Sequence, residues 1–152
     1  QNLEAIFQQV HANPELAFQL DETAALVAKK LKKMGYKVHT GIAQTGLAAV
    51  LKNGEGPVIM FRSDMDALPV KEDSGLPYAS KKQVTLDDGS SQYVSHACGH
   101  DAHTAWLLGI AKVMMETRDS WSGTLVLVGQ PAEELIAGAQ AMVDDGLYDK
   151  VP

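Results

Sequence analysis

Two short apolar runs separated by a helical pattern constrain the fold of this chain more than any other feature. Residues 58–62 (VIMFR) and 124–128 (TLVLV) have the length and the near-continuous hydrophobicity of strands that are covered on both faces, as in a parallel sheet. Between them, residues 104–116 repeat apolar side chains at helical spacing. Strand, helix, strand is a βαβ unit, in which the strands run parallel and the crossover is right-handed. We therefore predict an α/β fold with a mostly parallel sheet flanked by helices.

The remaining elements are predicted from local patterns. Residues 21–34 are expected to form a helix that opens with Asp21 and Glu22, ends in lysines and is followed by a glycine. Residues 70–94 are polar and turn-rich, and we expect a loop or a small hairpin there. The other predicted elements are short: a polar turn with the helix-breaking Pro14 at 11–16, strands at 36–38 and 46–51, and a helix at 138–145.

The composition excludes several classes of protein. With 152 residues, of which 45% are hydrophobic and 21% charged, the chain fits one globular domain. The net charge is −6, and the lysine cluster at 29–33 lies in the last turns of a predicted helix, where cations favour the negative end of the dipole. We therefore expect no nucleic-acid partner and, since no apolar run approaches membrane-spanning length, no membrane partner. The single cysteine excludes an internal disulfide.

Three polar clusters should meet at one edge of the predicted sheet. Asp64 and Asp66 follow the first apolar strand, and Glu133 and Glu134 follow the second. In open α/β sheets, sites form beyond the carboxyl ends of the strands. The stretch at 95–104 (SHACGHDAHT) must enter its helix from that same edge. The topology alone therefore predicts that residues distant in sequence form one site.

The chemistry of the stretch at 95–104 indicates a metal site. It contains Cys98 and His100, separated by one glycine that lets the backbone bend tightly, with Asp101 and His103 beside them. Thiolate, imidazole and carboxylate groups bind zinc, manganese, cobalt or nickel. A divalent cation also removes the repulsion among the clustered carboxylates. With an open position, it lowers the pKa of a bound water to roughly 7.

The two adjacent glutamates can divide the chemistry between them. We predict that Glu134 ligates the metal and that Glu133 takes the proton from the water. Four further residues are predicted to support the ligands without binding the metal, with Arg62 as an ion-pair partner of the aspartates: Asp64, Asp101, His103 and Arg62.

Other interpretations of the same residues are kept open. The two aspartates can cap a turn, the two glutamates can form a solvated helix start, and 95–104 can be a histidine-rich surface loop. A closed structural zinc site is a further alternative, because four ligands are at hand in Cys98, His100, His103 and Glu134. Structural sites favour additional cysteines, however, and the spare carboxylates have no structural task. His11 and His39 are predicted to be structural.

Four motifs together resemble a known family. They are HANPEL at 11–16, RSDMDALP at 62–69, HACGHDAH at 96–103 and QPAEE at 130–134. In this order they resemble the metal-dependent amidohydrolases of the aminoacylase/carboxypeptidase family, in the branch of hippurate hydrolase, the auxin-conjugate hydrolases and N-acetyl-diaminopimelate deacetylase. The resemblance extends from about residue 11 to the end of the chain.

The resemblance implies a reaction and a role for each site residue. Cys98, His100 and Glu134 would ligate a pair of divalent ions, from manganese, zinc, cobalt or nickel. Glu133 would be the general acid/base, and Asp66 would orient the groups beside the metals. The implied reaction is hydrolysis of an N-acyl (acetyl, benzoyl or similar) amino acid or a short peptide, in which a metal-bound hydroxide attacks the amide carbonyl.

The resemblance also implies that residues 1–152 are the N-terminal part of a zinc-peptidase-like catalytic domain. The family draws further metal-binding histidines from later sequence, and it carries an inserted lid domain through which the full-length protein would form a homodimer. We therefore expect this stretch alone to be incomplete for activity. Two alternatives from the residues themselves are a non-catalytic metal-binding fragment and a two-metal aminopeptidase or dipeptidase.

Overall fold

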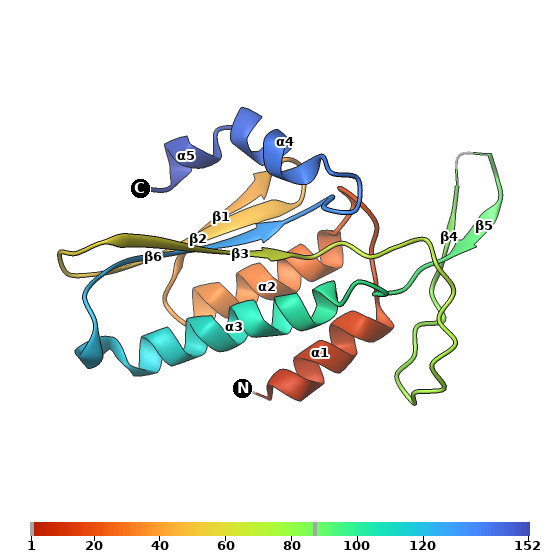
Figure 1. Ribbon diagram of the computed structural model, residues 1–152, viewed down its shortest axis with the longest axis horizontal. Coiled ribbons are helices and arrows are strands. Elements are labelled where there is room, and N and C mark those ends of the chain that lie inside the picture. The colour runs from red at the N-terminus through yellow and green to blue at the C-terminus, as the bar shows by residue number, and fades with distance from the viewer. Residues whose placement is uncertain (1, 87) are drawn as a thin grey trace.

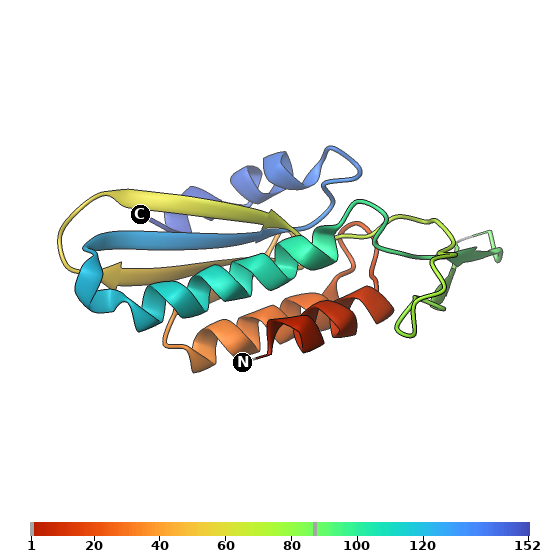
Figure 2. The same cartoon turned by 60° about the horizontal axis from the view of Figure 1, so that its bottom comes forward.

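A mixed sheet lies between two groups of helices in the computed structural model, which describes residues 2–86 and 88–152 (Figure 1). Three helices cover one face of the sheet, and two short ones pack on the other (Figures 1 and 2). The helices are α1 (Leu3–Ala12), α2 (Asp21–Lys33), α3 (His100–Glu116), the 3-10 turn η1 (Arg118–Ser120), α4 (Gly138–Asp144) and α5 (Leu147–Lys150). The strands are β1 (Lys37–Ile42), β2 (Gly46–Asn53), β3 (Val58–Asp64), β4 (Gln83–Thr85), β5 (Ser91–Tyr93) and β6 (Gly123–Gln130).

The strand order of the main sheet is β1-β2-β6-β3. β3 pairs with β6 in parallel, from Val58 opposite Thr124 to Asp64 opposite Gln130, whereas β2 is antiparallel to both β1 and β6. β1, β6 and β3 therefore point in one direction and β2 runs against them. The α/β class and the βαβ unit β3–α3–β6 are confirmed, and the mostly parallel sheet contains one reversed strand.

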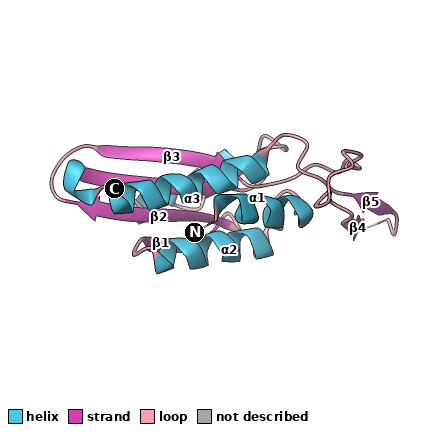
Figure 3. Cartoon of the chain, turned by 90° about the horizontal axis from the view of Figure 1, so that it is seen from below, coloured by secondary structure: helices cyan, strands magenta, loops and turns pink. Residues whose placement is uncertain are grey.

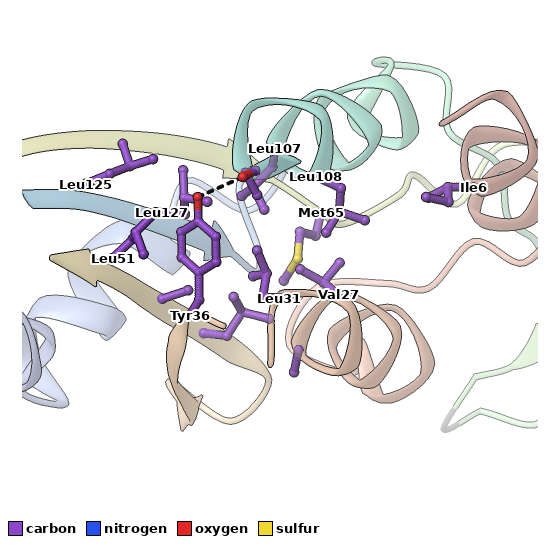
Figure 4. Packing of buried hydrophobic residues seen from close by; sticks show 14 of the residues in the cluster. Ile6, Val27, Leu31, Tyr36, Leu51, Met65, Leu107, Leu108, Leu125 and Leu127 are labelled. Atoms are coloured by element: carbon purple, nitrogen blue, oxygen red, sulfur yellow. Dashed lines mark hydrogen bonds between the residues drawn. The ribbon is translucent and has the colours of Figure 1, made fainter. Parts of the chain in front are cut away.

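The two faces of the sheet bury separate apolar clusters. Along β6, Leu125 and Leu127 face α2 and α3, while Val126 and Val128 face α4 and α5. This alternation follows from the two-residue period of a strand. Figure 4 shows the larger cluster, in which the hydroxyl of Tyr36 donates a 2.9 Å hydrogen bond to the carbonyl of Ala111 on α3. Figure 3 shows α1, α2 and α3 lying across this face of the sheet.

The edge strand β3 differs from the prediction. Residues 58–62 were expected to be covered on both faces, but Val58, Ile59 and Met60 are 51%, 61% and 39% exposed. The reason is their position, because β3 is the edge strand of the sheet that the structure describes, next to β6, and α4 packs on β6. An apolar run indicates a surface that must be covered; it does not say which segment covers it.

The other local predictions are largely correct. The helix at 21–34 is α2, and the turn-rich region contains the small hairpin β4–β5, whose residue 87 lies outside the described residues. α1 was not predicted, although it ends before Pro14 as the turn interpretation requires. α3 begins at His100, four residues earlier than expected, so this histidine belongs to the first helical turn. Within the part of the chain that the structure describes, no helix has both the length and the apolarity needed to span a bilayer.

Candidate metal centre

The candidate site lies where β3 and β6 end and α3 begins (Figure 1). Asp64 is the last residue of β3 and pairs with Gln130, the last residue of β6. The chain continues from one strand to Asp66 and from the other to the glutamate pair. α3 enters from the same edge with His100 as its first residue. The structure therefore brings the three polar clusters together as the topology argument requires.

His100 is oriented by the backbone of the neighbouring segment. Its ring is almost fully buried, and Nδ1 lies 2.7 Å from the carbonyl oxygen of Asp66. Since a carbonyl only accepts, Nδ1 carries the proton and Nε2 is left for another partner. Nε2 lies 3.6 Å from Oε2 of Glu133. Burial disfavours the charged ring, but the hydrogen bonds to Asp66 and the charges of Asp66 and Asp64 outweigh it and raise the pKa of His100 to about 9.

Asp66 connects the ends of the two strands. Its buried carboxylate accepts the backbone N–H of Glu133 at 3.1 Å and that of Glu134 at 3.0 Å. Burial raises the pKa of Asp66, but the hydrogen bonds from His100 and from these two N–H groups outweigh it, so the pKa of Asp66 is lowered. The glutamates lie in a turn that precedes α4, and the interpretation as a solvated helix start is therefore wrong.

Glu134 and Glu133 differ in environment. The side chain of Glu134 is 17% exposed, and its Oε1 is buried without a hydrogen-bond partner among the described residues. Glu133 is 42% exposed. One ligand atom each from His100, Glu133 and Glu134 lies within 4.8 Å of the others. A buried carboxylate oxygen without a partner is costly, and a divalent cation bound beside His100 would satisfy it. The donor set therefore fits a metal.

A second group of possible ligands shares His100 with the first. Asp64, His100 and His103 also offer ligand atoms within 4.8 Å of one another. Arg62 pairs with Asp64 and donates to Oε1 of Gln130 at 2.9 Å, so Asp64 already has a cationic partner. The ring of His103 stacks on that of His100 with centroids 5.2 Å apart, and the ring of Trp106 lies 5.3 Å beyond His103.

Cys98 lies in the exposed turn before α3, outside both groups. The neighbouring Glu134 carboxylate raises the pKa of the Cys98 thiol, and burial and the charges of Glu133 and Asp66 act in the same direction. A thiolate at this position therefore needs a nearby cation. Gly99, which follows, has a φ of 77°, the left-handed conformation that glycine adopts readily.

One predicted residue, Asp101, lies outside both ligand groups, and its contact with His11 was not predicted. Asp101 is buried and lies 2.5 Å from Nδ1 of His11, whose Nε2 lies 2.9 Å from Glu72. Nothing in the sequence singled out Glu72, while His11 belonged to the HANPEL motif. Both ring nitrogens of His96 are buried without a partner among the described residues, and burial lowers the pKa of His96 to about 4.

The chain is similar to known hydrolases over almost its whole length. It is 48% identical to the hippurate hydrolase of Campylobacter jejuni, over 97% of this chain and 36% of that protein. It is 42% identical to the N-acetyl-L-cysteine deacetylase of Bacillus subtilis, over 96% of this chain and 33% of the relative. It is 40% identical to IAA-amino acid hydrolase ILR1-like 5 of Arabidopsis thaliana, over 96% of this chain and 32% of that relative. The chain thus spans about a third of the length of these relatives.

Solved structures agree with the sequence comparisons. The Bacillus subtilis YXEP protein, described as a dinuclear metal binding peptidase from the M20 family, superposes with a TM-score of 0.85 at 35% identity, over 98% of this chain and 40% of that one. The aminobenzoyl-glutamate utilization protein of Klebsiella pneumoniae superposes with a TM-score of 0.72 at 25% identity, over 98% of this chain and 41% of that one. The sequence model of peptidase family M20/M25/M40 matches residues 60–151. The resemblance found in the motifs is confirmed, and the chain belongs to peptidase family M20/M25/M40.

Proposed function

We propose that the protein to which this chain belongs is a metal-dependent amidohydrolase that cleaves the amide bond of N-acyl amino acids. The observation that carries the proposal is the buried, unpartnered Oε1 of Glu134, which lies 3.9 Å from Nδ1 of His100 at the carboxyl ends of two parallel strands. The names of the three relatives support the substrate class, since the compound in each name is an amino acid that carries an acyl group. Because the chain spans about a third of these relatives, the activity is proposed for the whole protein.

The metal would be held by Cys98, His100 and Glu134. A thiolate, an imidazole and a carboxylate suit manganese, zinc, cobalt or nickel. We infer a pair of ions because the Bacillus subtilis relative of known structure is described as dinuclear. When bound, a divalent cation acidifies water and polarises the amide carbonyl. The hydrogen bond from His100 to the Asp66 carbonyl fixes the ring so that Nε2 faces the site.

Glu133 is the proposed general base and Asp66 the residue that positions it. The exposed carboxylate of Glu133 can accept a proton from water and pass it to the leaving amine. Asp66 accepts the N–H groups of both glutamates, so it sets the direction in which each side chain leaves the backbone. Asp64, Arg62 and His103 form the neighbouring wall of the site.

The test uses the full-length protein and the substitution Glu133→Gln. We expect the variant to retain wild-type metal content and to lose release of the amino acid from an N-acetyl or N-benzoyl amino acid. Glu55→Gln, on an exposed side chain of the same type, is the matched control and should leave turnover unchanged. Turnover that survives in Glu133→Gln would refute the general-base role. Equal hydrolysis of blocked and unblocked dipeptides would contradict the substrate class.

Cys98→Ser tests the ligand set in the same protein. We expect its metal content to fall, because a serine hydroxyl is a far weaker ligand than a thiolate. Metal bound equally by wild type and variant would remove Cys98 from the proposed site. For the 152-residue chain alone, we expect metal binding without full turnover. Stoichiometric metal without turnover in the full-length protein would favour a non-catalytic metal-binding role.

A further inference from the structure

His11, in the last turn of α1, lies between two carboxylates from distant parts of the chain. Nδ1 is 2.5 Å from Oδ2 of Asp101, and Nε2 is 2.9 Å from Oε1 of Glu72. The side chains are 12%, 3% and 10% exposed for His11, Asp101 and Glu72. Carboxylates accept, so both ring nitrogens donate and His11 is an imidazolium that bridges the two acids.

Aromatic side chains shield this bridge from water. The rings of Phe7 and Tyr78 lie 5.5 Å and 5.3 Å from the His11 ring, and they contact each other edge to face. Hydrogen bonds between charged groups strengthen where water is excluded. Burial lowers the pKa of His11, but the hydrogen bonds and charges of Glu72 and Asp101 outweigh it, so this pKa is raised.

Asp101 transmits the constraint to the candidate metal centre. It follows His100 directly, and its Oδ1 accepts the N–H of Ala102 in the first turn of α3. Its carboxylate is therefore held by its own helix on one side and by His11 on the other. α3 has no side-chain N-cap, and Gly99 before it has open space where a Cβ would lie. The bond from His11 is thus a side-chain anchor for the turn that carries His100.

The residues after His11 support the two other parts of the site through the backbone. The carbonyl of Glu15 accepts the N–H of Ala67 at 2.8 Å, and Ala67 directly follows the Asp66 carboxylate. The carbonyl of Ala17 accepts the N–H of Ala132 at 3.0 Å, immediately before the glutamate pair. One continuous segment, 11–17, therefore contacts all three parts of the chain that carry candidate metal-binding side chains.

We propose that His11 is a positioning residue of the candidate metal centre, which fixes Asp101, and with it the first turn of α3, without contacting the metal. The proposal rests on the metal-dependent function proposed above. Ligands that are held in place bind a metal more tightly than ligands that must be ordered on binding. The bond to Glu72 has a separate task, because Glu72 also accepts the N–H of Ser80 at 2.6 Å and so orders the loop before β4.

Three substitutions separate the two bonds of His11. Asparagine places its amide nitrogen near the position of Nδ1, so His11→Asn retains a donor to Asp101 and loses the one to Glu72. Glutamine reaches the position of Nε2, so His11→Gln retains the bond to Glu72 only. His11→Phe removes both and keeps a ring against Phe7 and Tyr78. The matched controls are the same substitutions at His39, a half-buried histidine on β1 that forms no ion pair among the described residues.

The first measurement is the Co²⁺ affinity of the full-length protein, read from the visible absorption of the bound cobalt. Removing a partner that orients a ligand typically costs about 10- to 100-fold in metal affinity. We expect His11→Gln and His11→Phe to weaken Co²⁺ binding by about that factor. His11→Asn should rescue the affinity to within about threefold of wild type. Wild-type affinity in all three variants, or equal losses at His11 and His39, would overturn the proposal.

The second measurement needs no metal and separates this proposal from the proposed function. Amide hydrogen exchange of the metal-free chain should accelerate at Ala102 in His11→Gln and His11→Phe. It should accelerate at Ser80 in His11→Asn and His11→Phe. If exchange accelerates at Ala102 and Ser80 as described and the wild type binds no Co²⁺, the metal site is refuted, whereas the role of His11 in ordering α3 is supported. Unchanged exchange at Ala102 in every variant would refute that role even if the wild type binds Co²⁺.

Discussion

Replacing Asp66 by asparagine should destabilise the metal-free protein, because this one carboxylate connects the ends of β3 and β6. It is 1% exposed and accepts the N–H groups of Glu133 and Glu134. In Asp66→Asn one N–H keeps an amide oxygen as its acceptor, while the other faces an amide NH₂ group. The first change replaces a charged acceptor by a neutral one, and the second leaves a buried donor unsatisfied.

The magnitude follows from the two bonds. A hydrogen bond to a charged group contributes about 1.5–3 kcal/mol and a neutral one about 0.5–1.5 kcal/mol. Losing one bond and weakening the other therefore costs about 3–4 kcal/mol. Relief of repulsion from the neighbouring carboxylates offsets part of this cost, and we expect a net loss of about 2–3 kcal/mol. For a chain of this size, the loss corresponds to a decrease of about 4–12 °C in Tm.

The assay is urea unfolding followed by circular dichroism, at neutral pH and with a chelator present. Asp144→Asn is the matched control, because Asp144 is exposed and, among the described residues, its carboxylate accepts from Gln140 alone, also on α4. The control should unfold within about 0.5 kcal/mol of wild type. NMR titration of His100 provides a second readout, since loss of the Asp66 charge should lower its pKa from about 9. Unchanged stability together with an unchanged pKa of His100 would refute the assignment of Asp66 as the connecting group.

Three further predictions concern stability. The folded-state pKa of His100 is raised to about 9, so protonation of this ring stabilises the folded metal-free chain. This contribution to the free energy of unfolding is complete below about pH 6.5 and is lost as the pH rises towards 9, which urea unfolding across this range will detect. Leu127→Ala, at a fully buried position, should cost about 2–5 kcal/mol, whereas Ile59→Ala, 61% exposed, should cost less than about 1 kcal/mol in the same assay. Glu15→Ala should lower the free energy of unfolding by about 0.5–2 kcal/mol, because this carboxylate accepts the N–H groups of two residues in the first turn of α2. Unchanged thermal unfolding would contradict that capping role.

The sequence predicted the meeting of the polar clusters because that result depends only on topology. Once 58–62 and 124–128 are parallel strands joined by a helix, Asp66, His100 and the glutamate pair must share an edge. The reversed direction of β2 could not be found in the same way, since antiparallel pairing depends on contacts between segments far apart in the chain. The helix α1 did carry a signal that was missed, because Leu3, Ile6 and Val10 recur at helical spacing.

The finer contacts of the site could not be predicted from the sequence. The contact of His11 with Asp101 joins residues 90 positions apart, and neither partner has a pattern that selects the other. The role of Glu15 as a cap of α2 was equally hidden, because α2 begins after Leu20, which has no capping side chain. Residue type predicted which side chains could bind a metal, whereas packing determined which of them face one another.

The neighbouring rings of His100, His103 and Trp106 give the protein an optical reporter. Trp106 is 59% exposed and its indole lies beside His103, whereas the indole N–H of Trp121, the second tryptophan, donates to the carbonyl of Met114 at the far end of α3. A paramagnetic ion bound at His100 would therefore quench the fluorescence of Trp106 and leave that of Trp121 largely intact. Occupancy of the centre can thus be followed by fluorescence in the unlabelled protein, without any turnover.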